Sequence, residues 1–76
     1  MRPQKVVVYT RPGCHLCDDA CALLERYGLA PDRVNIDADP VLQSRYGLLI
    51  PVVEFDGKER FRGRVDEVLL QRLLIS

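Results

Sequence analysis

The spacing of apolar residues along the chain changes several times, and each change predicts a new secondary-structure element. β-Branched and aromatic residues follow one another through residues 5–10, which predicts a central strand buried on both faces of a sheet. Pro12 and Gly13 interrupt that run. From Cys14 onward apolar residues recur at helical spacing until Gly28, so the strand leads directly into a helix.

The next segment carries the signals of a second strand and a short helix. Apolar and polar residues alternate over residues 33–37, and a strand there would run parallel to the first after a right-handed crossover. Asp39 suits a helix N-cap. Pro40 has no backbone N–H, but the N–H at the first helical position makes no hydrogen bond within the helix, so proline is favourable there. We therefore expect a helix over residues 40–46, ended by Gly47.

The last third of the chain predicts a β-hairpin followed by a helix. Strand-like runs over residues 52–55 and 59–61 flank Asp56-Gly57, a strong signal for a two-residue hairpin turn. Apolar residues over 65–74 then form one wide helical face. The predicted order is βαβαββα, and residues 1–76 are expected to form a single α/β domain without a linker.

Composition narrows the class of protein. The chain has eleven basic and eleven acidic residues and no basic stripe interleaved with aromatic residues, so we expect no nucleic-acid partner. Its apolar runs are far shorter than the roughly 18 to 20 residues of a membrane span, which predicts a soluble, cytoplasmic protein with no membrane partner. All three cysteines lie close together, as in a site rather than in a secreted disulfide framework.

Two of these cysteines lie where the first strand leads into the first helix. Cys14 and Cys17 are three residues apart, so they can close a small disulfide ring or present one thiolate to solvent. Unpaired backbone N–H groups and the positive end of the helix dipole stabilise a thiolate there. Arg11 and a protonated His15 add positive charge, whereas the Asp-Asp pair after Cys17 opposes it. The first hypothesis is therefore a dithiol redox site.

Other interpretations of the same residues stay open. The two cysteines could simply be small apolar residues of a helix. They could also belong to a copper carrier, since soft thiolates bind Cu(I), or to a non-catalytic binding module. The predicted element order argues against a carrier like the small copper chaperones, which run βαββαβ. Cys21 has the pattern of a buried small residue, and His15 that of a solvated residue at a helix start.

The stretch Tyr9-Thr10-Arg11-Pro12-Gly13-Cys14-His15-Leu16-Cys17 resembles the active-site stretch of glutaredoxins, which usually reads Tyr-Thr-Lys-Pro-Gly followed by Cys-Pro-Tyr-Cys. Leu49-Ile50-Pro51 stands where glutaredoxins have Thr-Val-Pro, and residues 61–67 stand where they have a Gly-Gly pair and two aspartates. The resemblance covers nearly the whole chain. It implies a thioredoxin-like fold of the glutaredoxin type, in which a four-stranded mixed sheet has the first and third helices on one face and the short second helix on the other.

The resemblance also implies chemical roles for individual residues. Cys14 would be the attacking thiol, Cys17 the resolving thiol, and Pro51 a cis-proline that faces the pair. The backbone of Ile50 would then pair with an extended peptide or with glutathione, as an added strand does.

Further residues are assigned to substrate binding by the same resemblance. Arg11 matches the lysine that meets a glutathione carboxylate. Gly63 and Asp66 match part of the pocket for the other end of the tripeptide, and His15 stands beside the attacking thiol.

The resulting hypothesis is a thiol-disulfide oxidoreductase that reduces disulfide-containing proteins. Its electrons would come from glutathione or a thioredoxin-type reductase, with no bound metal or organic cofactor. The chain departs from the glutaredoxin pattern because Cys-His-Leu-Cys replaces Cys-Pro-Tyr-Cys and Arg64 stands in place of the second glycine. A side chain there should obstruct close approach of the tripeptide, so we expect weak activity with glutathione.

Overall fold

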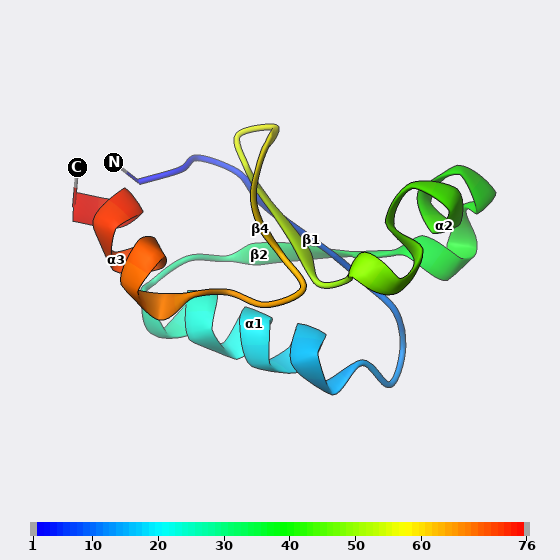
Figure 1. The fold of residues 1–76 in the computed structure, drawn as a ribbon. Helices are drawn as coiled ribbons and strands as arrows, with labels where there is room; N and C mark the ends of the chain where they lie inside the picture. The colour runs from blue at the N-terminus through cyan, green and yellow to red at the C-terminus, as the bar shows by residue number, and fades with distance from the viewer. Residues whose placement is uncertain (1, 76) are drawn as a thin grey trace.

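The structure is a computed structural model that describes residues 2–75, and its elements follow the predicted order. Within these residues a four-stranded sheet in the order β2-β1-β3-β4 packs against three α-helices (Figure 1). β1 (Val6–Thr10) pairs in parallel with β2 (Pro31–Asn35) and antiparallel with β3 (Val52–Phe55). β4 (Lys58–Arg62) pairs antiparallel with β3. The sheet is therefore mixed, and β1 lies inside it as predicted.

The first helix, α1 (His15–Arg26), ends at the predicted glycine. The N–H of Gly28 donates to the carbonyl of Glu25 at 2.9 Å. The N–H of Leu29 donates to the carbonyl of Leu24 at 3.1 Å. This pair of bonds is the Schellman arrangement, and Gly28 adopts the left-handed conformation that it requires, with φ +80°.

The second strand lies two residues earlier than the alternating pattern predicts. β2 ends at Asn35, and Ile36–Ala38 form a 3-10 turn, η1. The side chain of Asn35 explains the early end, because its Oδ1 accepts a hydrogen bond from the N–H of Asp37 at 2.9 Å and stabilises a turn. Ile36 is nevertheless fully buried.

β1 is buried on one face and only half-buried on the other, so the prediction that both faces are buried is wrong. Val8 is fully covered, whereas Val7 and Tyr9 on the opposite side remain partly exposed. The reason is that α2 (Pro40–Tyr46) reaches only the end of that face (Figure 1). There the Tyr46 ring stacks on Tyr9 with ring centroids 4.4 Å apart.

Helices α1 and α3 (Glu67–Ile75) together cover the other face, as predicted. Buried residues of both helices form one core with the inward-facing residues of the sheet: Val6, Val8, Cys21, Leu24, Leu29, Val53, Phe55, Phe61 and Leu70. α3 begins two residues later than expected because Asp66 caps it, its Oδ1 accepting from the N–H groups of Val68 and Leu69 at 2.9 and 3.2 Å. Within residues 2–75 no helix has the length and apolar content to cross a membrane.

The turn between β3 and β4 also holds the start of β1. Asp56 and Gly57 have φ values of +51° and +85°, the left-handed conformation that a two-residue hairpin turn needs at both central positions. The Oδ1 of Asp56 accepts hydrogen bonds from the N–H groups of Gln4 and Lys5 at 3.0 and 2.9 Å. The hairpin tip is thereby tied to the amino end of the central strand.

Two neighbouring leucines of α3 allow a matched test of this core. Leu70 is 0% exposed and Leu69 is 48% exposed. We expect Leu70→Ala to lower the free energy of unfolding by about 2 to 5 kcal/mol, because it removes a buried side chain and leaves a cavity. Leu69→Ala should change it by only about 0.5 kcal/mol. Urea denaturation measures both values, and equal losses would contradict the assignment of the core face.

Candidate functional site

The dithiol pair lies at the junction between β1 and α1. Cys14 is the N-cap of α1, and its Sγ accepts a hydrogen bond from the N–H of Cys17 at 3.2 Å. A disulfide joins the two residues, whose Cα atoms are 5.3 Å apart, within the usual range for such a bond. The structure therefore shows the oxidised form of the pair.

The two cysteines of the pair differ in their access to solvent. Cys14 is half-buried at the surface, whereas Cys17 is 0% exposed and packs in a cluster with Ile36, Ile50 and Val52. A sulfur atom of another molecule can therefore approach Cys14 but not Cys17. Access of the attacking thiol is one of the factors that set the rate of thiol-disulfide exchange.

Ile50 and Pro51 lie beside the pair. The peptide bond between them is cis, as the resemblance implies. Both residues are buried, and Ile50 belongs to the cluster that contains Cys17. The N–H of Gly63 donates to the carbonyl of Pro51 at 2.8 Å, which brings the segment after β4 to the same place.

Exposed apolar side chains border this region. Leu16 lies between the two cysteines, and Leu48 and Leu49 directly precede Ile50; all three leucines are exposed. Leu48 and Leu49 belong to a short 3-10 turn, η2 (Gly47–Leu49), whose sequence has no regular period, so pattern analysis could not assign them a face. Contiguous exposed apolar surface commonly marks a contact surface.

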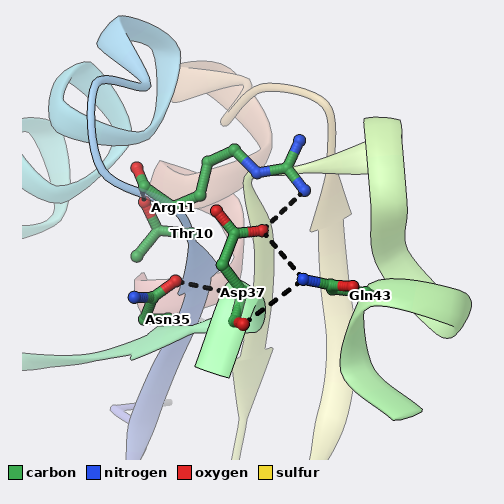
Figure 2. A network of polar contacts seen from close by, with 5 residues as sticks. All are labelled: Thr10, Arg11, Asn35, Asp37 and Gln43. Carbon is green, nitrogen blue, oxygen red and sulfur yellow. Dashed lines mark hydrogen bonds and ion pairs between the residues drawn. The ribbon is translucent and has the colours of Figure 1, made fainter. Parts of the chain in front are cut away.

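Arg11, predicted to bind a substrate carboxylate, contacts a carboxylate of its own chain. Its Nη2 donates to the Oδ1 of Asp37 at 2.9 Å (Figure 2). The Nε2 of Gln43 donates to the same Oδ1 at 3.4 Å and to the Asp37 carbonyl at 3.3 Å. The N–H of Asp37 also donates to the side chain of Asn35. Asp37 is therefore held by Arg11, Gln43 and Asn35.

Sequence reasoning missed Asp37. Local spacing contains no signal for its contact with Arg11, because 26 residues separate the two. The predicted topology does contain one. β1 and β2 are parallel neighbours, so their carboxyl ends meet at one edge of the sheet, and Arg11 and Asp37 follow those two ends.

The remaining predicted site residues have clear structural positions. His15 is the first residue of α1 and is exposed. Asp66 caps α3, so its carboxylate already accepts two backbone hydrogen bonds. Gly63 has φ +83° and open space where a Cβ would stand, so the backbone conformation, rather than crowding, favours glycine there.

A surface cavity of about 240 Å³ lies between α1 and the segment before α3. Apolar and charged residues line it together: Leu16, Asp19, Ala20, Leu23, Arg64 and Val65. Arg64 therefore lines a hollow that reaches the first turn of α1, next to the dithiol pair.

Two further ionisable side chains lie close to the site. Cys21 is a free, fully buried thiol one helical turn after Cys17. Burial raises the pKa of the Cys21 thiol, while the charge of Arg33 acts in the opposite direction. Burial and the adjacent Glu54 carboxylate raise the pKa of Tyr9 to about 12, and the Tyr9 hydroxyl donates to Glu54 at 3.2 Å. Neither group is therefore poised to lose a proton near neutral pH.

Comparison with known families identifies the chain. The sequence model described as "Glutaredoxin-like domain (DUF836)" matches residues 5–75. The chain belongs to this glutaredoxin-like family. A search of curated proteins found no match. The observed order βαβαββα also distinguishes this glutaredoxin-like domain from the βαββαβ order of the small copper chaperones.

Solved structures support the same conclusion about the fold. The crystal structure of target protein XcR50 from X. campestris matches with a TM-score of 0.79 and 37% identity, over 91% of this chain and 93% of that one. Its solution structure matches with a TM-score of 0.77 and 36% identity, over 93% and 92%. The glutaredoxin Grx-1 from Archaeoglobus fulgidus matches with a TM-score of 0.68 over 95% and 87%, and at 21% identity it shows the shared fold alone. The fold is thioredoxin-like, as predicted.

The different exposure of the three thiols predicts their order of alkylation. In the reduced glutaredoxin-like protein, iodoacetamide near neutral pH should modify Cys14 well before Cys17 and Cys21, because only Cys14 is accessible and lies at a helix N-terminus. Peptide mapping by mass spectrometry at increasing reaction times measures the order. Equal rates at all three positions would contradict the assignment of Cys14 as the accessible thiol.

Proposed function

We propose that this glutaredoxin-like protein is a thiol-disulfide oxidoreductase that reduces disulfides in protein substrates. The observation that carries the proposal is the arrangement of its cysteine pair: Cys14 is accessible at the N-cap of α1, and Cys17 is buried within bonding distance of it. The N–H of Cys17 and the positive end of the helix dipole favour the Cys14 thiolate over the thiol.

The proposed reaction transfers two electrons through a mixed disulfide. The Cys14 thiolate attacks one sulfur of the substrate disulfide, the S–S bond breaks, and the other substrate sulfur leaves as a thiolate that takes up a proton. Cys17 loses its proton and attacks the Cys14 sulfur, which releases the second substrate sulfur as a thiolate. The substrate is then fully reduced, and the Cys14–Cys17 disulfide is the oxidised product.

The surroundings of the pair favour a protein substrate. Leu16, between the two cysteines, and Leu48 and Leu49, just before Ile50, are exposed apolar side chains, and an extended peptide segment would supply apolar area to cover them. The backbone of Ile50, beside the cluster that holds Cys17, would pair with that segment as a neighbouring strand does.

Two cysteine variants test the reaction and its assigned roles. Cys14→Ser should abolish the reduction of insulin disulfides, because it removes the attacking sulfur. Cys17→Ser should accumulate a mixed disulfide on Cys14, because attack survives while resolution is lost. Mass spectrometry of the trapped peptide locates the bond. Retained activity in Cys14→Ser, or a substrate trapped on Cys21, would overturn the proposal.

The electron donor is a separate proposal, and it concerns Arg64. We expect the oxidised protein to be reduced faster by a thioredoxin-type reductase than by glutathione, because the side chain of Arg64, which lines the hollow beside the first turn of α1, should obstruct close approach of the tripeptide. Arg64→Gly should then raise the rate with glutathione. The control is Arg60→Gly, since Arg60 is an exposed arginine of β4. Rapid reduction of the unmodified protein by glutathione, unchanged by Arg64→Gly, would contradict this assignment.

A further inference from the structure

The ion pair between Arg11 and Asp37 stands next to the reactive sulfur. The carbonyl of Arg11 accepts a hydrogen bond from the N–H of Cys14 at 3.3 Å, so the cation belongs to the turn that carries this cysteine. Asp37 follows Ile36, whose buried side chain lies in the cluster that contains Cys17. The residues on both sides of the ion pair therefore contact the turn and the cluster that hold the two cysteines.

Stability gives a poor explanation for this pair. Only one nitrogen of Arg11, Nη2, bonds to Asp37, and among residues 2–75 the buried Nε of Arg11 has no hydrogen-bond partner. An unpartnered buried donor opposes folding, and an ion pair between partly exposed side chains contributes little in return.

The orientation of Asp37 is nevertheless well defined. Gln43 donates to the same oxygen that binds Arg11, and Asn35 fixes the backbone of Asp37, as Figure 2 shows. The second terminal nitrogen of the Arg11 guanidinium points away from Asp37 in this view. The carboxylate thus faces Arg11 in a fixed position and engages one terminal nitrogen of the guanidinium, while the other is directed away from it.

We infer that Asp37 determines the specificity of the dithiol site by neutralising Arg11, an inference that rests on the proposed thiol-disulfide exchange. A free guanidinium binds a carboxylate in a planar fork. With Asp37 in place, a substrate carboxylate has two ways to reach Arg11. It can displace the Asp37 carboxylate, which also breaks the hydrogen bond from Gln43, or it can bind beside Asp37 against the repulsion of a like charge. The site therefore disfavours small thiols and disulfides that carry carboxylates, such as glutathione, and favours uncharged disulfide segments of proteins.

The test compares two unreactive ligands that differ by one carboxylate. S-methylglutathione and its glycine ethyl ester are titrated into the oxidised protein and the dissociation constants are measured by NMR. Asp37→Asn, which preserves the size of the side chain and an acceptor for Gln43, should bind S-methylglutathione about two- to fivefold more tightly, the range of a surface ion pair. The ester should bind both proteins equally, and adding Arg11→Gln to Asp37→Asn should remove the gain.

Asp32→Asn is the matched control, because Asp32 is an exposed carboxylate of the same strand β2 that leads to Asp37. It should leave both dissociation constants unchanged. Unchanged binding of S-methylglutathione by Asp37→Asn would overturn the inference, as would an equal gain for the ester or for Asp32→Asn. If thermal melting shows that Asp37→Asn is unfolded, Asp37→Ser is tested with the same expectations.

A kinetic measurement separates this inference from the proposed function. The ratio of kcat/KM for glutathione disulfide to that for the uncharged 2-hydroxyethyl disulfide should rise about two- to fivefold in Asp37→Asn. The titration uses unreactive ligands and does not depend on catalysis. Activity that survives Cys14→Ser would therefore refute the proposed function, but the titration would still decide the role of Asp37. An unchanged ratio of kcat/KM values in an active Asp37→Asn enzyme would refute only the role of Asp37.

Discussion

The site depends on one constraint: a strand at the centre of the sheet must lead directly into a helix whose first residue positions carry the two cysteines. β1 lies between β2 and β3, so the turn after β1 has two neighbours at the same edge of the sheet. They are the segment that follows β2 and the segment that precedes β3. The N-cap of α1 then places Cys14 at the surface, and one helical turn carries Cys17 inward. Neighbouring strands bring Asp37 and Pro51 to the same edge, although neither is close to Cys14 in sequence.

Element order and most boundaries were predictable because the signals are local. Gly28 and Asp56-Gly57 act through their own backbone conformations, which sequence reveals without knowledge of the rest of the chain. The two displaced boundaries have the same type of cause. Asn35 and Asp66 each use a side-chain oxygen to bind backbone N–H groups a few residues ahead, and this contact outweighs the apolar pattern around it.

The site was predictable in part. The cysteine pair and the cis-proline follow from motifs that are contiguous in sequence, and the resemblance to glutaredoxins assigned them together. The partner of Arg11 is a tertiary contact that no contiguous motif contains. The same resemblance assigned Asp66 to substrate binding, which stays a prediction, and the structure adds that its carboxylate caps α3. A contiguous motif thus identifies the cysteine pair, but it does not reveal a charge that folding brings beside Arg11.

The two ends of β1 serve different purposes, and this matters for anyone who attaches the protein to something else. At the amino end, Asp56 binds the backbone of residues 4 and 5 to the hairpin tip, and the first and last described residues of the chain lie on that side of the molecule (Figure 1). The N-terminus of α1, with Cys14, points the opposite way (Figure 1). A tether to an electrode, a resin or a fused redox domain, attached near residue 2 or residue 75, would therefore lie on the side of the molecule away from Cys14.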